Sequence, residues 1–592
     1  MIKYLRRYIQ YNEIFSDSYL SIEEIKKEFS HFEKASLLEI LCKINLALWK
    51  HRLERSLQFR LSQFLFSEDD YRLVEKALLR NKGLIFHRQQ ILFCIKLLLS
   101  VVTIEEGKLE HANMYKNKLG KILLSLNDYT EPLGSNVAQL IKNKLDTSRQ
   151  GFARAWYFTH TGDIRNRMAR CLTLWIKIPR SKRGRELLQN ISFNPKKEFL
   201  AETGLSMFEF IGTTLALLAK YLSIEPKTAK AEDFLLHKLT YFSTTKLEEM
   251  KRIGIFNQLL LDKARFNEIY NNDVKSILNG EDIREYNFLS FEDKPLIELD
   301  KDKIIPIDPY YLANKVTDGI YWILLNRFKR LGEFKKKRGR ELSKYYGHLI
   351  QEYVFQILRN ICDEVIELPP DDKKTADFIC KIIHNDRIFL VVSDSKKIAL
   401  QHRTKILSDR ENTLKDLDRI FGVKSGFAQI YETIRRIRQN KVKGINVNLG
   451  EIDGIFPILI TDREICEDPL SRLLYEMKYF NDHKKRLFHM PKPKIFEPIF
   501  ICLDELEVIE SYCISQGKEQ FLKLILERNR ILKIRKTESY VYKIPVQLVP
   551  LWNYLYELGF MQYENQRLIE TFKYYHEKMA DKLFVSNVFH ED

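Results

Sequence analysis

The chain has 592 residues, of which 45% are hydrophobic. A chain of this length is too long for a single hydrophobic core, so several domains are expected. Its 97 Lys and Arg against 80 Asp and Glu leave a formal charge of +17, which would attract a polyanion if gathered on one face and otherwise marks a large, well-charged soluble protein. The eight scattered cysteines exclude a disulfide scaffold and a zinc clasp, no apolar run has the length of a membrane span, and the first residues lack a secretory signal, so we expect a cytoplasmic protein.

Residues 1–264 repeat apolar residues at spacings of three and four between charges, as in "IEEIKKEFSHFEKASLLEILCKINLALWK". This spacing predicts amphipathic helices, and the lack of a fixed longer period favours a bundle or array over a regular solenoid. We therefore expect an all-helical N-terminal region. Residues 1–330 hold 53 basic and 41 acidic residues, so +12 of the net charge lies in this part of the chain.

Residues 265–334 are predicted to form a mixed α/β connector. Its segments "PLIEL" and "KIIPI" indicate two strands, and a helix is expected from Tyr310. The polar run "KKKRGR", residues 335–340, is the predicted linker to the next domain.

Residues 335–465 show a definite order of elements. An amphipathic helix in "RELSKYYGHLIQEYVFQILRNI" precedes candidate strands at 363–368, 375–383 and 387–394, and a helix at 425–440 precedes a strand at 454–461. The turn "HND" between the second and third strands suits a hairpin. Residues 466–592 are predicted to be a mostly helical C-terminal extension, interrupted by the apolar strand "EPIFICL".

Acidic side chains stand at the ends of two predicted strands, against the usual preference of strands for apolar residues. Side chains alternate along a strand, so Asp394 and Lys396 share one face, and pairing through the short turn brings Asp377 close to Asp394. Two carboxylates this close repel unless a cation lies between them, and oxygen ligands suit Mg²⁺ or Mn²⁺. Lys396 would then orient or deprotonate a water and stabilise charge on a phosphate. The alternative is a solvated strand end with an ion pair worth under ~1 kcal/mol.

This order of elements, with Asp377 on the second strand and Asp-x-Lys ending the third, resembles the PD-(D/E)xK nuclease superfamily of restriction-endonuclease-like folds over about residues 340–462. The resemblance implies that Glu352, on the first helix, is a further catalytic and metal-binding residue. It also implies that Gln429, on the helix after the third strand, lies near the site as a further catalytic residue. The sequence departs from the motif at Ala376, where the named proline would be, and at Asp394, where glutamate is commoner.

The stretch after the motif is basic, because residues 396–443 contain 13 Lys and Arg against five acids. A phosphate backbone bound at the site would need neutralising there, although a solvated helix face is the alternative. The predicted nucleic-acid-binding residues are Lys397, Arg403, Lys405, Arg435, Arg436 and Arg438.

Together these features predict an α+β multidomain protein whose restriction-endonuclease-like core is a Mg²⁺- or Mn²⁺-dependent endonuclease. The expected substrate is DNA rather than RNA, and the resemblance implies a role in bacterial restriction or anti-phage defence. A second copy or a defence-system protein is expected as a further partner, and no membrane is expected because the apolar runs are too short. The helical N-terminal region would carry substrate or trigger recognition, and a fragment that begins at residue 331 is expected to fold. The rival interpretation is a nucleic-acid-binding or scaffold protein with a catalytically degenerate nuclease fold.

Overall fold

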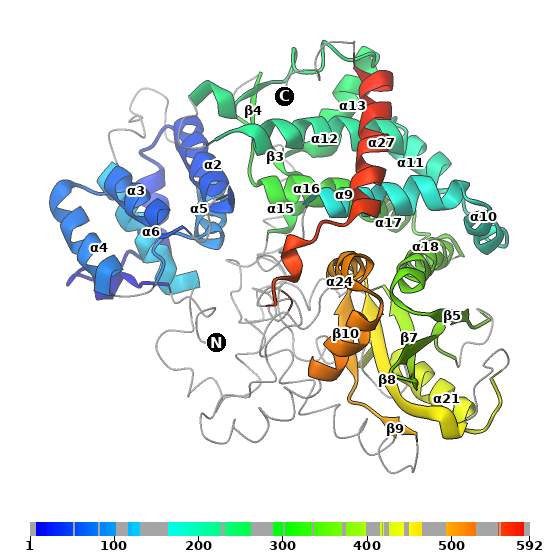
Figure 1. The fold of residues 1–592 in the computed structure, drawn as a ribbon. Helices are drawn as coiled ribbons and strands as arrows, with labels where there is room; N and C mark the ends of the chain where they lie inside the picture. The colour runs from blue at the N-terminus through cyan, green and yellow to red at the C-terminus, as the bar shows by residue number, and fades with distance from the viewer. Residues whose placement is uncertain are drawn as a thin grey trace. The chain divides into compact units, whose positions relative to one another are not determined.

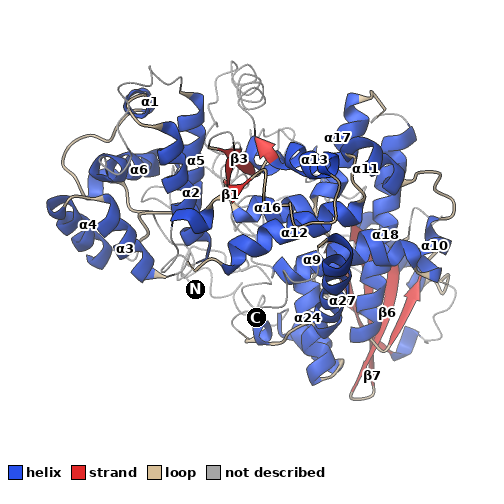
Figure 2. Cartoon of the chain, turned by 90° about the horizontal axis from the view of Figure 1, so that it is seen from above, coloured by secondary structure: helices blue, strands red, loops and turns tan. Residues whose placement is uncertain are grey.

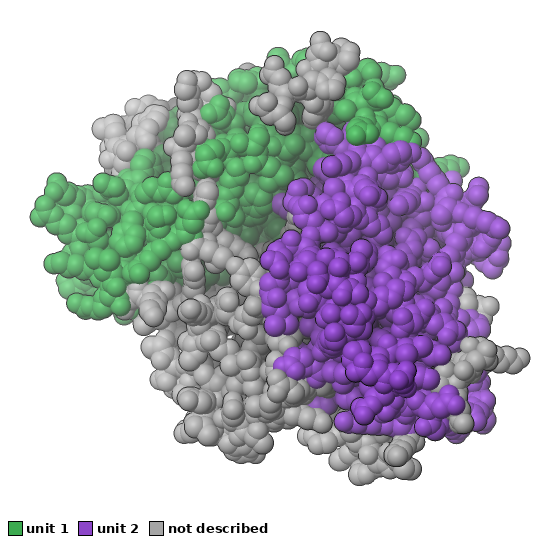
Figure 3. Space-filling model, in the orientation of Figure 1, with its two compact units in different colours: residues 1–142, 196–323, 577–592 green, residues 143–195, 324–576 purple. Residues whose placement is uncertain are grey.

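The chain is mixed α+β and divides into two compact units, each built from separate segments of sequence. In the computed structural model, unit 1 comprises residues 1–142, 196–323 and 577–592, and unit 2 comprises residues 143–195 and 324–576 (Figure 3). The residues that the structure describes are 8–50, 54–80, 83–101, 116–130, 164–225, 231–261, 288–299, 302–333, 337–369, 375–397, 415–416, 418–419, 426–442, 449–463, 493–528, 555 and 558–584.

Unit 1 is largely helical, as its apolar spacing predicts. Its helices are α1 (Ile22–Phe29), α2 (Lys34–Lys50), α3 (Arg55–Leu65), α4 (Glu68–Arg80), α5 (Arg88–Ser100), α6 (Lys116–Thr130), α11 (Pro195–Thr203), α12 (Met207–Ser223), α13 (Glu249–Leu259), α15 (Leu289–Asp293) and α16 (Pro309–Thr317). In the described part of the chain no single helix is long and apolar enough to cross a membrane, and only the bent pair α11 and α12 meets that test when taken together.

The expectation of an all-helical region before residue 265 was wrong in one respect. The predicted strands β3 (Leu296–Glu298) and β4 (Lys303–Pro306) are present, but they belong to a sheet of order β1-β4-β3-β2. Its outer members, β1 (Leu236–His237) and β2 (Leu260–Leu261), come from the region predicted to be helical. Two-residue strands leave no alternating pattern in the sequence, so periodicity does not reveal them.

Unit 2 is built around a second sheet, whose order is β10-β8-β7-β6-β5 with β9 beside β8 (Figures 1 and 2). The three predicted strands β5, β6 and β7 form an antiparallel meander, and β8 and β10 continue it in parallel. The strands are β5 (Glu364–Glu367), β6 (Phe378–His384), β7 (Arg387–Lys396), β8 (Ile452–Thr461), β9 (Lys494–Ile495) and β10 (Ile499–Cys502).

Helices cover both faces of this sheet. On one face Phe355 of α18 (Lys337–Ile361) contacts Phe378 of β6, with ring centroids 6.1 Å apart. On the other, Phe427 of α21 (Gly426–Arg438) contacts Phe500 of β10 at 5.4 Å. Helix α24 (Leu503–Gln516) follows β10 and packs against α18 (Figure 1). The predicted order of helix, three strands, helix and strand is therefore present, and α18 begins inside the run predicted to be a linker.

Residues 164–195 also belong to unit 2, although they precede its sheet by more than a hundred positions. They form α9 (Ile164–Leu172), a π-helical turn (Thr173–Lys177), a 3₁₀ turn (Ile178–Arg180) and α10 (Lys182–Leu188). Trp175, buried to 1% exposure, packs against the rings of Tyr345 and Tyr346 in α18. Helix α17 (Gly319–Arg330) crosses the boundary between the units, and α27 (Gln566–Leu583) begins in unit 2 and ends in unit 1.

This arrangement reverses the expectation for a fragment that begins at residue 331. Such a fragment loses Trp175, whose removal alone typically costs about 3–5 kcal/mol in a packed core. It also leaves the acidic side chains that pair with Arg170 and Arg183 without their cations. We expect fragment 331–592 to be insoluble or unfolded by circular dichroism, and coexpression with residues 143–195 to improve its recovery. A monomeric, cooperatively folded fragment 331–592 would contradict this packing.

Candidate active site

The hairpin of β6 and β7 sets the geometry of the candidate site. Asn385 and Asp386 both have positive φ, 50° and 60°, which is the conformation of a two-residue type I′ turn. The pairing then runs from His384 opposite Arg387 to Phe378 opposite Ser393. Continued by one position, the same register places Asp377, which directly precedes β6, opposite Asp394, as the sequence predicts.

Asp394 is a buried carboxylate with an incomplete set of partners. Its side chain has 0% exposure, and Oδ2 lies 2.8 Å from Nζ of Lys396, which is 35% exposed. Its other oxygen, Oδ1, has no hydrogen-bond partner among the described residues. An orphaned, fully buried oxygen costs free energy unless a cation or donor meets it, so this atom is a candidate ligand for a cation.

The pKa shifts of Asp394 and Lys396 indicate a shortage of positive charge around them. Burial, and then the charge of Asp377, raise the pKa of Asp394 well above its usual range, against the opposing effect of Lys396. Burial acts to lower the pKa of Lys396, but Asp394 and Asp377 together outweigh it and raise this pKa. Both groups therefore hold their protons more tightly in the folded chain than they do in water.

Asp377 lies just before β6 and is anchored by β7. Its Oδ2 accepts hydrogen bonds from the backbone N–H of Ser395, at 2.8 Å, and from the Ser395 hydroxyl. Helix α21 fixes the preceding residues, because Thr433 accepts from the N–H of Ala376 and Gln429 donates its amide to the carbonyl of Thr375. Gln429 thus lies near the site, where its hydrogen bond holds the backbone that leads into Asp377.

Glu352 is held in a different place from Asp394. Side chains alternate along β7, so Asp394 shares a face with Leu459 and Phe500, its partners in register, which is the face that α21 covers. Glu352 extends from α18 with a side chain only 4% exposed, and its Oε2 accepts from Nε of Arg183. Its Oε1 accepts from Gln356 at 2.9 Å. The expected joining of Glu352 to the two aspartates is therefore replaced by an ion pair with an arginine.

No group of three or more His, Cys, Asp or Glu side chains stands ready to hold a metal ion within the described ranges. The structure brings together Asp377, Asp394 and Lys396, and leaves Glu352 with Arg183. The oxygen donors of Asp377 and Asp394, with the orphaned Oδ1, still fit a hard divalent cation such as Mg²⁺ or Mn²⁺.

Glu367, at the end of β5, is a residue of this region that the sequence analysis missed. Its Oε2 accepts from Nη2 of Arg183, so the same guanidinium joins Glu367 to Glu352. Burial raises the pKa of Glu367 against the opposing effect of Arg183, with Glu352 and Asp377 adding to the rise. Glu367 therefore links the Arg183 cluster, defined here as Arg183, Glu352 and Glu367, to Asp377. The sequence signal was an acid on a strand that ends beside Asp377.

Arg183 reaches this cluster through an unusual stretch of backbone. A π-helical turn and a 3₁₀ turn precede α10, and Ser181 caps its first turn by accepting from the N–H of Gly184. A Cβ at position 184 would lie 1.9 Å from the carbonyl oxygen of Ile178, so only glycine fits there. The Arg183 guanidinium also lies over the ring of Phe355, 3.7 Å from its centroid. This segment holds the arginine in one place.

The predicted nucleic-acid-binding residues have mixed surroundings. Arg435 and Arg436 both donate to Glu432 within α21, and the hydrogen bond from Arg435 is the largest of the effects that lower the pKa of Glu432 to about 2. Arg438 donates to the carbonyl of Pro493, and Lys397 lies over the ring of Tyr346. Arg403 and Lys405 lie outside the residues that the structure describes.

Replacing Arg435, Arg436 and Arg438 by Gln is expected to weaken DNA binding equally for all sequences. The slope of log affinity against log salt should become shallower by about 0.9 for each phosphate that the protein no longer neutralises, since fewer counterions are released. Fluorescence anisotropy over a salt series measures both. Arg72→Gln, which removes an exposed intrahelical arginine from α4, is the control. Wild-type affinity and slope in the triple variant would assign these arginines to the Glu432 pairs and to solubility.

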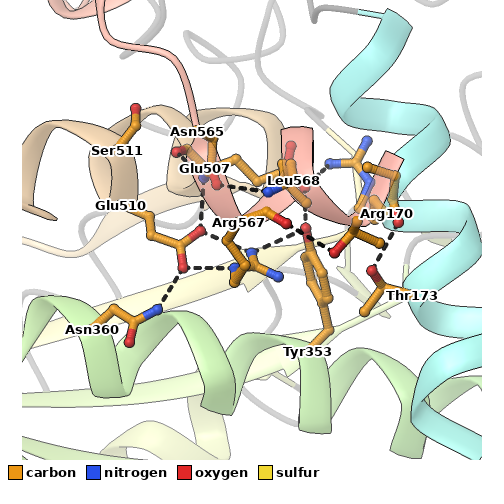
Figure 4. A network of polar contacts seen from close by, with 12 residues as sticks. Arg170, Thr173, Tyr353, Asn360, Glu507, Glu510, Ser511, Asn565, Arg567 and Leu568 are labelled. Atoms are coloured by element: carbon orange, nitrogen blue, oxygen red, sulfur yellow. Dashed lines mark hydrogen bonds and ion pairs between the residues drawn. The ribbon is translucent and has the colours of Figure 1, made fainter. Parts of the chain in front are cut away.

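A buried polar network joins α18 to α24 and α27, and joins α9 to α24 (Figure 4). Tyr353 donates to Glu507 of α24 at 2.6 Å, and Arg170 of α9 donates to the same carboxylate at 3.0 Å. Arg567 of α27 donates twice to Glu510, whose oxygens also accept from Asn360 and Asn565. Because Tyr353 follows Glu352 directly, this network also fixes the rotation of the helix that carries Glu352.

The network predicts a pH dependence of stability. Burial raises the pKa of Glu507 to about 7, although Arg170 opposes the rise. A carboxyl whose pKa is higher in the folded chain than in the unfolded one, about 4.3, favours folding only while it is protonated. Its contribution to the free energy of unfolding should therefore decrease as pH rises from about 4.3 to 7. Urea titrations across this range should show a smaller decrease for Glu507→Gln, and equal pH profiles would contradict the prediction.

Comparison of the chain with protein-family models, with curated proteins and with solved structures gave no match.

Proposed function

We propose that this chain is a metal-dependent nuclease that hydrolyses phosphodiester bonds, of DNA rather than RNA. The observation that carries the proposal is the buried, partly orphaned carboxylate of Asp394, set opposite Asp377 and paired with Lys396 at the ends of two neighbouring strands. Acids with a shifted pKa beside a fixed cation are typical of catalytic sites. An acid at a solvated strand end would be exposed to water, whereas Asp394 is buried.

The proposed core is a restriction-endonuclease-like domain over about residues 335–465. Support comes from the antiparallel strands β5, β6 and β7, the parallel strand β8, and the helices α18 and α21 on opposite faces. The parallel strand β10 and helix α24, from the predicted C-terminal extension, extend the same sheet and its helical cover.

Asp377 and Asp394 would hold one Mg²⁺ or Mn²⁺ ion in this proposal. When bound, the ion would polarise the scissile phosphate and activate water for attack. The chain's own groups do the rest: Ser395 orients Asp377 through two hydrogen bonds, and the ammonium of Lys396 places a positive charge where charge grows on the phosphate. Lys396 therefore acts as a cation and a hydrogen-bond donor.

The biological part of the proposal is restriction or anti-phage defence in a bacterial cytoplasm. It rests on the resemblance of the motif and on the net charge of +17, of which +12 lies in residues 1–330. In this scheme the helical N-terminal region recognises the substrate or the trigger, and a second copy or a defence-system protein is a further partner.

The test is cleavage of plasmid DNA, linear DNA and RNA with Mg²⁺, with Mn²⁺ and with chelator. The proposal expects metal-dependent cleavage of DNA by the wild type. Lys396→Ala should lose cleavage and keep the thermal stabilisation that Mn²⁺ confers, because the lysine is not a ligand. Absence of cleavage on every substrate with either metal would overturn the proposed activity.

The second candidate is a nucleic-acid-binding or scaffold protein with a degenerate nuclease fold. One observation favours it: Glu352 forms an ion pair with Arg183 and does not join the two aspartates. DNA binding without cleavage, together with no stabilisation by Mn²⁺, would support this candidate.

A further inference from the structure

Arg183 is bound as a cation by two carboxylates beside the proposed metal site. Its Nε donates to Glu352 and its Nη2 to Glu367, from α18 and β5 respectively. Glu352 is almost fully buried, whereas the Arg183 side chain is 36% exposed. Two carboxylates that converge on one positive group, with a path to solvent, are also the surroundings in which proteins bind divalent cations.

The carboxylates near the ends of β5, β6 and β7 outnumber the cations that pair with them. Glu352 and Glu367 share Arg183 as their cation, whereas Asp377 and Asp394 share Lys396, so four carboxylates, each counted as ionised, face two cations. The difference is two negative charges, which one divalent ion neutralises. Without Arg183 the difference would be three, and the two glutamates would have no counterion.

We propose that Arg183 takes the place of a second divalent cation, so that the site binds one metal ion and not two. This inference rests on the proposed function, since it assigns the first ion to Asp377 and Asp394. It also assigns Glu352 and Glu367 a role as partners of the arginine outside the metal shell. Many phosphodiesterases use two divalent ions. Here a fixed guanidinium occupies the place between two carboxylates that a second ion would take.

The backbone around Arg183 supports a dedicated position over an incidental ion pair. The π-helical turn before it is a rare conformation that is frequent at functional sites, and glycine is required at the next residue. The guanidinium also lies over the ring of Phe355, 3.7 Å from its centroid. An ion pair that served stability alone would need none of these features.

The experiment is a Mn²⁺ titration of the full chain, with bound ion counted by equilibrium dialysis and free Mn²⁺ followed by electron paramagnetic resonance. We expect one ion on the wild type and two on Arg183→Gln, where the freed glutamates gain an ion. Arg185→Gln, which removes an exposed arginine from the same helix, is the matched control and should bind one. Glu367→Gln should also bind one ion with wild-type affinity.

The outcomes separate this inference from the proposed function. Two ions on the wild type, or one ion on both the wild type and Arg183→Gln, would overturn the role of Arg183 and leave the nuclease proposal intact. No ion on the wild type or on Arg183→Gln would overturn both. If Arg183→Gln does not fold, Glu367→Gln decides: an affinity loss of about tenfold or more, the size seen when groups that support a metal site are removed, would make Glu367 part of the metal site and overturn the inference.

Discussion

Asp394→Asn is expected to abolish cleavage and to leave the metal-free protein at least as stable as the wild type. The wild-type carboxylate is fully buried with one orphaned oxygen, and its raised pKa means that folding disfavours its charge. Asparagine has the same shape without the charge, so the free energy of unfolding should stay equal or increase by about 1 kcal/mol, a rise of about 2–4 °C in melting temperature. Activity should fall at least about 10³-fold, because catalytic residues that act as a unit fail together.

Thermal shift with and without Mn²⁺, beside a cleavage assay, measures both effects. The variant should lose the stabilisation by Mn²⁺ that the wild type shows. Ser393→Ala is the matched control, since Ser393 is equally buried one residue away and its hydroxyl also lacks a hydrogen-bond partner among the described residues. That control should keep cleavage and the Mn²⁺ response. Undiminished cleavage by Asp394→Asn would remove the assignment of this site.

The largest expected loss of stability comes from Arg567→Met in the network of Figure 4. Arg567 donates twice to Glu510, whose side chain has 0% exposure, so its removal leaves a buried, uncompensated carboxylate. Breaking a buried ion pair from one side typically costs about 3–5 kcal/mol. Urea unfolding should show this decrease in the free energy of unfolding.

Arg165→Met is the matched control, because Arg165 and Glu564 form an exposed pair, 3.7 Å apart, in the same part of unit 2. Exposed pairs contribute under about 1 kcal/mol, so this variant should unfold close to the wild type. The double variant Arg567→Met with Glu510→Leu should recover part of the loss, since the buried charge is gone but Asn360 and Asn565 lose their acceptor. Equal losses for Arg567→Met and Arg165→Met would show that burial is not the cause.

The parts of the fold and site that local sequence determines were predictable. The strands β6 and β7 have apolar runs, and the short turn between them sets a register in which Asp377 lies opposite Asp394. The same alternation placed Asp394 and Lys396 on one face, and their nitrogen and oxygen atoms lie 2.8 Å apart. These inferences needed only the period of a strand and the length of a turn.

The parts that depend on distant contacts were not predictable. Arg183 lies 169 positions before Glu352, and its segment resembles a polar break between helices. An acid on an amphipathic helix carries no local sign of which face of a sheet it will meet, so Glu352 was assigned to the aspartates. The packing of Trp175 on Tyr346 and the joining of β10 to β8 likewise depend on residues far apart in the chain.

Unit 2 is built from segments far apart in the sequence, which affects when its parts can pack during synthesis. Arg170 and Glu507, which meet in the interior, are 337 positions apart, and a ribosome adds roughly 5–20 residues per second. For tens of seconds the nascent residues 164–195 therefore lack the helices against which they pack, and a high contact order slows the step that follows. A ribosome that stops before residue 567 releases a chain whose Glu510 has no arginine, so α18 and its Glu352 lack part of their support. The buried network that supports α18 and Glu352 is thus complete only after Arg567 has been synthesised.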